Sequence, residues 1–201
     1  NFNKYRRNLL KLPTIHVHQS PRTEATVTHN AVTLPTPHSN FGIAVAQRLA
    51  LPPPTDPDCG SVACIALTFD DGPDPINTPK VLDALDGEGV KATFFLVGNR
   101  VAADAALVRR MASEGHEIGN HSWSHPDFTK LNAQQIQDQI IGAQNAITAL
   151  GLPPPQMFRP PYEDRNGFVL SHIHMPVILW NIDPKDWHEK DPNKIVQIIT
   201  S

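Results

Sequence analysis

Two adjacent carboxylates and a pair of histidines are the residues best suited to chemistry. Asp70 and Asp71 end an apolar run in Thr68-Phe69-Asp70-Asp71-Gly72-Pro73, and His121 and His125 frame a later His-Ser-Trp-Ser-His segment. Adjacent acids repel unless a cation is present, so one can bind a metal while the other stays free as a base. One Asp and two His leave open positions for water, which is typical of a catalytic metal site. The pattern therefore indicates metal-assisted hydrolysis.

Each half of this pattern also has a simpler interpretation. Asp-Asp-Gly-Pro is ordinary turn chemistry, and a lone histidine pair four residues apart is more often a surface coincidence than a ligand pair. The two halves support each other because each follows the end of a predicted strand. For the other eight histidines we expect solvent or packing roles: His16, His18, His29, His38, His116, His172, His174 and His188.

Alternating apolar and amphipathic stretches predict the elements that must position these residues. From Val62 onward the alternation is typical of βαβ units and a parallel sheet, either a (β/α) barrel or a doubly wound sheet. Both architectures bind ligands at the carboxyl ends of their strands. The expected strands are 63–69, 92–97, 117–119, 157–159 and 177–182, and the expected helices are about 79–86, 104–114, 132–150 and 191 to the chain end.

Composition limits the other possibilities. A net charge of −3 with 18% charged residues gives no basic excess, so a nucleic-acid partner is not expected. No stretch is long and apolar enough to predict a membrane span. Residues 1–60, rich in Pro, Thr and His, read as an N-terminal arm or linker, and residues 61–201 as the folded domain.

The only two cysteines, Cys59 and Cys64, lie five positions apart. A small-loop disulfide, which would imply an oxidising compartment, is the favoured interpretation. Two buried thiols in an intracellular protein are the alternative.

Four motifs together resemble the signatures of the NodB-type polysaccharide deacetylases, carbohydrate esterase family four. They are Thr68-Phe69-Asp70-Asp71-Gly72, His121-Ser122-Trp123-Ser124-His125, Arg159-Pro160-Pro161-Tyr162 and Asp183-Pro184-Lys185-Asp186-Trp187. They occur in the family's order across about residues 62–201. The resemblance implies a distorted (β/α) barrel and a divalent metal, zinc in most cases or else cobalt.

The resemblance also implies a role for each site residue. Asp71, His121 and His125 would hold the metal, and Asp70 would be the general base that takes a proton from the attacking water. The backbone N–H of Tyr162 would help to hold the oxyanion, and its side chain would contact substrate.

The resemblance also assigns supporting roles. Arg159 would orient the carboxylates and keep Asp70 ionised. Asp186 would lie near the catalytic acid, and Trp187 would present an apolar wall to a sugar ring. Trp180 is assigned to the core.

Two features depart from the family pattern. Glu163 stands where the family usually has glycine after its Arg-x-Pro-Tyr motif. The family's fifth motif, a Leu-x-His strand that supplies the general acid, has no counterpart after the last predicted helix. We therefore expect the barrel's last strand or strands to be missing from this chain, and the native protein to continue beyond Ser201 or to be completed by a second polypeptide.

The function expected from these signs is removal of N-acetyl groups from N-acetylglucosamine units of peptidoglycan or a chitin-like polymer. Acetylxylan O-acetyl esterase is one alternative, because the same centre can cleave an ester. A noncatalytic carbohydrate-binding module that retains the metal site is another. The cysteine pair and the substrate class both favour an extracellular or cell-envelope location.

Overall fold

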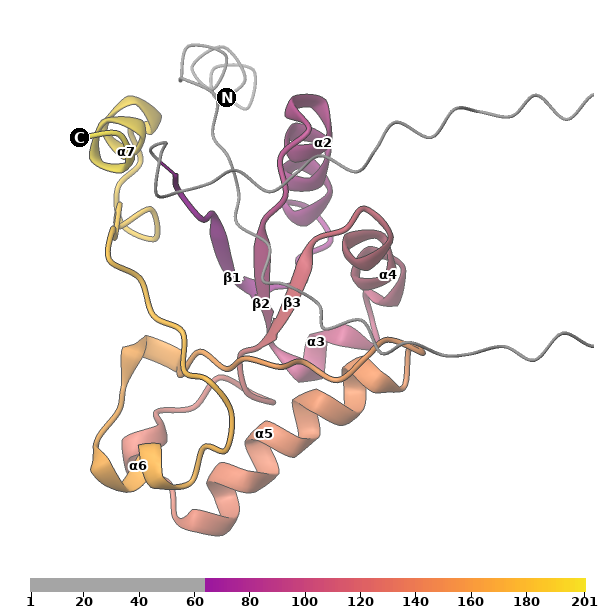
Figure 1. The fold of residues 1–201 in the computed structure, drawn as a ribbon, viewed down its shortest axis with the longest axis vertical. Helices are drawn as coiled ribbons and strands as arrows, with labels where there is room; N and C mark the ends of the chain where they lie inside the picture. Colours follow the sequence, from indigo (N-terminus) through magenta and orange to yellow (C-terminus); the bar gives the residue numbers. More distant parts are fainter. Residues whose placement is uncertain (1–63) are drawn as a thin grey trace, which may run out of the picture.

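A parallel sheet lies at the centre of the computed structural model, which describes residues 64–201 (Figure 1). Its strands β1 (Thr68–Gly72), β2 (Thr93–Leu96) and β3 (Glu117–Asn120) are hydrogen-bonded in the order β1-β2-β3. The predictions at 92–97 and 117–119 are confirmed. The first strand begins at Thr68, later than expected, so Asp70 and Asp71 lie inside the strand near its carboxyl end.

The two other predicted strands are reduced to single bridges. Phe158 pairs in parallel with Asn120 on one side and with Val177 on the other, and no ladder follows over 177–182. Prolines flank both segments and have no N–H to donate to a ladder. The carbonyls of Ile178 and Leu179 accept hydrogen bonds from the Arg159 side chain instead of from a neighbouring strand.

The helices were largely predictable from caps and periodicity. The structure contains α2 (Thr78–Glu88), α4 (Ala105–Ser113), α5 (Ala133–Thr148) and α7 (Pro192–Ile199), each close to an expected range. Two short helices, α3 (Gly98–Val101) and α6 (Gly167–Ser171), and two 3₁₀ turns, η1 (Phe128–Lys130) and η2 (Pro161–Glu163), were not expected. Such short elements complete too few turns to produce a periodic signal.

Local caps explain where the main helices begin and end. Asn132 and Gln135 form a capping box at the start of α5, and Asp191 caps α7. Helix α2 ends at Gly89 in the left-handed conformation, with φ of 65°. No helix within residues 64–201 is long and apolar enough to cross a membrane.

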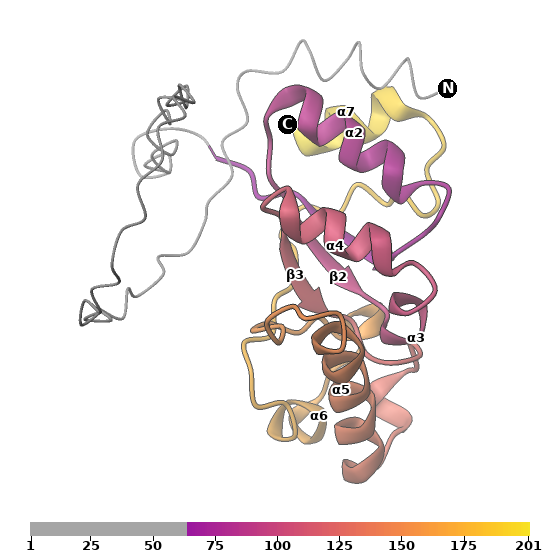
Figure 2. The same cartoon turned by 90° about the vertical axis from the view of Figure 1, so that its right-hand side faces the viewer.

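Two apolar clusters fix the helices against the sheet. One joins β2 to α2 and α4 through residues such as Phe94, Leu82 and Met111, and the other joins α5 and α6 through Ile136 and Val169. Helices α2 and α4 therefore lie together beside the sheet, while α5 runs across the end at which the strands finish (Figures 1 and 2). This arrangement leaves the carboxyl ends of β1 and β3 to carry the site.

Close contacts at α3 bring it against α5. A Cβ added to Gly98 would lie 2.6 Å from the Cα of Ala143 and 2.9 Å from the ring of Trp123. The N–H groups of Gly98 and Asn99 also donate to the carbonyls of Ser122 and Trp123. Helix α3 is thereby fixed to the segment that carries the two histidines.

Candidate metal and catalytic site

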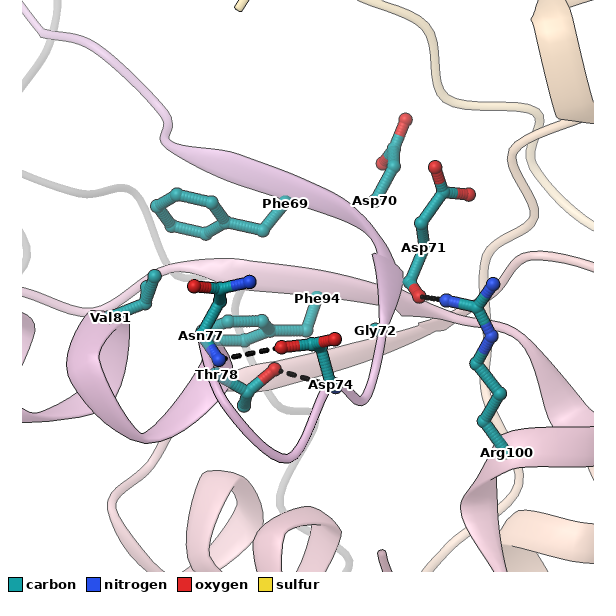
Figure 3. Close-up of a pocket in the computed structure, with 10 residues that line it drawn as sticks. All are labelled: Phe69, Asp70, Asp71, Gly72, Asp74, Asn77, Thr78, Val81, Phe94 and Arg100. Carbon is teal, nitrogen blue, oxygen red and sulfur yellow. Dashed lines mark hydrogen bonds between the residues drawn. The ribbon is translucent and has the colours of Figure 1, made fainter. Parts of the chain in front are cut away.

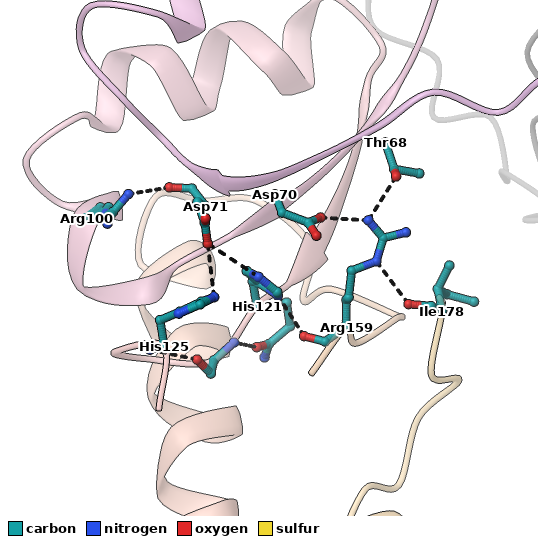
Figure 4. Close-up of polar contacts among 10 residues, drawn as sticks. Thr68, Asp70, Asp71, Arg100, His121, His125, Arg159 and Ile178 are labelled. Atoms are coloured by element: carbon teal, nitrogen blue, oxygen red, sulfur yellow. Dashed lines mark hydrogen bonds and ion pairs between the residues drawn. The ribbon is translucent and has the colours of Figure 1, made fainter. Parts of the chain in front are cut away.

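Three side chains converge where β1 and β3 end. The Oδ1 atom of Asp71 lies 3.1 Å from Nε2 of His125 and 3.5 Å from Nε2 of His121. One possible ligand atom from each residue lies within 4.8 Å of the other two (Figure 4). A carboxylate and two imidazoles at this spacing fit a divalent transition metal and leave further coordination positions open.

The buried ring of His121 is oriented for coordination. Its Nδ1 lies 2.7 Å from the carbonyl oxygen of Arg159. A carbonyl can only accept, so Nδ1 carries a proton, and Nε2 is the ring nitrogen that faces Asp71. This is the usual arrangement of a metal-binding histidine, whose second ring nitrogen is fixed by a hydrogen bond.

A relay of polar contacts shapes the loop that carries His125. The buried Asn120 side chain donates to the carbonyl of Ile140 on α5 and accepts from the N–H of Ser122. The hydroxyl of Ser122 then accepts from the N–H of His125. Ser122 and His125 have φ values of 69° and 59°, which few residues other than glycine adopt. The hydrogen bonds hold this unusual backbone in place.

The local electrostatics favour the protonation states that bind metal. The hydrogen bond with His121 lowers the pKa of Asp71, against burial, which raises it; the charges of both histidines and of Arg100 lower it further. Burial is the main cause that lowers the pKa of His125. An ionised carboxylate and a neutral imidazole are the forms that act as ligands.

Asp70 lies beside this cluster and is held by Arg159. The Nη1 atom of Arg159 donates to Oδ1 of Asp70 at 2.7 Å and to the hydroxyl of Thr68 at 2.8 Å. The arginine side chain is only 2% exposed, and its guanidinium lies 4.1 Å from the ring centroid of Phe95. Trp180, assigned to the core, is half-buried, with its ring 5.3 Å from the same guanidinium.

A cleft opens beside the two carboxylates. It has a volume of about 290 Å³ and is bounded by the end of β1, the start of α2 and Arg100 of α3 (Figure 3). Asp74 lines it too, but its Oδ1 accepts the N–H groups of Ile76 and Asn77. Asp70 and Asp71 both line the cleft, whereas His121 and His125 do not.

Tyr162 also reaches the cluster. Its exposed ring packs edge-on against His125, with centroids 4.6 Å apart, and its backbone has φ of 57°. Its N–H has no hydrogen-bond acceptor within residues 64–201. The N–H predicted to bind an oxyanion therefore has no partner among the described residues, and the ring of the same residue contacts a predicted metal ligand.

Asp186 and Trp187 are not joined to the cluster. Both are exposed, Trp187 at 74%, and among the described residues neither makes a hydrogen bond or ion pair with Asp70 or the three clustered side chains. Their roles stay predictions. Cys59 lies outside the described residues, so its pairing with Cys64 also stays a prediction, as does the assignment of residues 1–60 as an arm.

Comparison with known proteins decides the family. A sequence model described as polysaccharide deacetylase matches residues 58–174. The chain belongs to this family. It is 46% identical over 123 residues to a peptidoglycan-N-acetylglucosamine deacetylase of Listeria monocytogenes, covering 61% of this chain and 26% of that protein. It is 37% identical over 146 residues to a chitooligosaccharide deacetylase of Bradyrhizobium, covering 71% of this chain and 67% of that protein.

A solved structure supports the fold. The family 4 acetyl xylan esterase of Clostridium thermocellum, determined with a cobalt ion, aligns with a TM-score of 0.63 at 37% identity. The alignment covers 66% of this chain and 65% of that one. The prediction of the family's distorted barrel is thereby confirmed, and the chain spans about a quarter of the Listeria relative named above.

Two residues of this polysaccharide deacetylase domain were missed by sequence reasoning. Asn120 organises the histidine loop, and Arg100 reaches the backbone of Asp71, to whose carbonyl its Nη1 donates. Each lies at or just beyond the carboxyl end of a predicted strand, β3 and β2 respectively. That position was the available signal, because ligand-binding residues gather there in parallel sheets.

Proposed function

We propose that this protein is a metal-dependent hydrolase that removes N-acetyl groups from N-acetylglucosamine units of a polysaccharide, either peptidoglycan or a chitin-like polymer. One observation carries the proposal: Asp71, His121 and His125 form a metal-binding set, and Asp70 is held beside it by Arg159. Relatives named as deacetylases of peptidoglycan and of chitooligosaccharides support the choice of substrate.

The chemistry divides between the metal and the side chains. Zinc or cobalt bound by Asp71 and the two histidines would polarise the acetyl carbonyl and activate water. Asp70 then accepts a proton at Oδ2, because Arg159 occupies Oδ1. The free N–H of Tyr162 donates to the oxygen on which negative charge develops.

Zinc is our proposed native metal, with cobalt as a second possibility. Two imidazoles and one carboxylate suit both ions. The cobalt in the related acetyl xylan esterase shows only that a relative's site accepts it. Measuring the metal content of protein purified without chelator or added metal distinguishes the two.

A substrate panel tests the reaction. Acetate release is measured from chitooligosaccharides, peptidoglycan fragments and acetylxylan, with and without zinc. Release from the two N-acetylated substrates, absent after chelation, is expected. Acetylxylan esterase activity is the second candidate function, because one related structure is an acetyl xylan esterase. Faster acetate release from acetylxylan than from the N-acetylated substrates would favour it. Metal binding without acetate release from any substrate would indicate a noncatalytic carbohydrate-binding module.

We also propose an extracellular or cell-envelope location with a Cys59–Cys64 disulfide. Peptidoglycan and chitin lie outside the cytoplasm, and small-loop disulfides persist in oxidising compartments. Thiol titration of the natively secreted protein should detect no reactive thiol before reduction and two after it. Two titratable thiols in the unreduced, unfolded protein would contradict this.

A further inference from the structure

Among residues 64–201, a positive charge without a carboxylate partner lies in the cleft beside Asp70 and Asp71. Arg100 is exposed on α3 and is the only Lys or Arg among the residues that line the cleft (Figure 3). Its Nη1 donates to the backbone carbonyl oxygen of Asp71, whose carboxylate belongs to the predicted metal cluster. Within residues 64–201 it forms no ion pair.

The acidic side chains of the cleft are already engaged. Asp70 is paired with Arg159, Asp71 faces His121 and His125, and Asp74 accepts N–H groups of its own turn. Arg100 therefore keeps its Nε and second Nη groups for a ligand. A guanidinium presents paired donors in a plane, which matches the two oxygens of a carboxylate.

The position of Arg100 is also fixed by the fold. Helix α3 packs closely on α5 at Gly98, and its first two N–H groups donate to the histidine segment. A cation carried on a fixed segment of backbone can select substrates, since binding then needs no reorganisation of that backbone.

We propose that Arg100 binds a carboxylate of the polymer close to the acetamido group being hydrolysed, so the preferred substrate is an acidic amino-sugar polymer. This rests on the proposed deacetylase function. Among the polymers considered above, peptidoglycan carries such carboxylates on its peptide substituents and on the lactyl groups that bear no peptide, whereas chitin is neutral. Arg100 is thus a specificity-determining residue.

The test compares one saccharide in two forms. Peptidoglycan tetrasaccharides with free lactyl carboxylates and the same tetrasaccharides with those groups amidated are offered to the zinc-loaded protein. We expect kcat/KM to be about fivefold to tenfold higher for the carboxylate form. The ratio of the two kcat/KM values should fall towards one in Arg100→Gln and be only partly reduced in Arg100→Lys. It should be unchanged in the control Arg109→Gln, which removes an exposed arginine from α4.

An unchanged ratio in Arg100→Gln, or no preference in the unmodified protein, would overturn the inference. A binding measurement distinguishes failure of this inference from failure of the proposed deacetylase function. If no saccharide releases acetate, dissociation constants of the same two forms are measured by calorimetry. A carboxylate preference that depends on Arg100 supports the inference even then, and equal affinities refute it.

Discussion

Replacing Arg159 with methionine tests how the base is held. The guanidinium makes four hydrogen bonds, to Asp70, to Thr68 and to the carbonyls of Ile178 and Leu179, at 2.7 to 3.2 Å. Methionine has a similar length but no donor. Removing one partner of a buried ion pair costs about 3–5 kcal/mol, and two backbone carbonyls also lose their donors.

The side chain of Asp70 is 29% exposed, so water takes over part of its lost interaction. We therefore expect Arg159→Met to lower the free energy of unfolding by about 2–4 kcal/mol, most of it from the carbonyls that lose their donors. Asp70→Asn should cost about 1 kcal/mol. In a double-mutant cycle, the coupling between the two changes should be about 1–2 kcal/mol.

Urea denaturation of the four proteins provides these values, with unchanged m-values confirming a common transition. Arg109→Met, an exposed change on α4, is the control and should alter the free energy of unfolding by less than about 0.5 kcal/mol. A loss below about 1 kcal/mol for Arg159→Met, or a coupling near zero, would refute the view that Arg159 organises Asp70 and the chain around it.

Three further results are expected. Gly98→Ala should destabilise the fold by about 1–3 kcal/mol, because the added Cβ forces α3 away from α5. Gly87→Ala has open space around its Cβ and should stabilise α2 by about 0.5–1 kcal/mol. Equal effects of the two changes in thermal unfolding would contradict this. Burial lowers the pKa of His116, so the unfolded chain binds its proton first, and stability should fall as pH drops below about 6.5. His116→Asn should flatten that part of the stability profile, and an unchanged slope would assign it to other groups. His121→Ala should weaken zinc binding by at least about 100-fold in calorimetry, because a ligand is removed, and unaltered affinity would exclude it from the site.

The structure brings three predicted ligands together but forms only part of the predicted sheet. Asp71 lies near the carboxyl end of β1 and the two histidines follow β3, and parallel strands end at a common edge. Residues 177–182 were expected to form a strand, since they are apolar. Their carbonyls are instead bound by Arg159, a long-range contact that no local pattern reveals.

The parts that escaped prediction depend on tertiary contacts. Asn120 serves the site through a hydrogen bond to Ile140 on a helix that comes later in the chain. Arg100, on helix α3, donates to the backbone of Asp71 on strand β1. Neither contact has a fixed spacing in sequence, so the sequence places these residues near the carboxyl ends of strands but does not reveal their contacts.

The central claim is that one cluster holds the metal while the neighbouring aspartate moves the proton. The direct measurement is zinc content and acetate release on the same samples of the unmodified protein and of Asp70→Asn, with N-acetylglucosamine oligomers as substrate. We expect one zinc per chain in both proteins, acetate release from the unmodified protein, and a rate at least about 100-fold lower in Asp70→Asn. Undiminished release by Asp70→Asn, or by protein from which all metal has been removed, would contradict it.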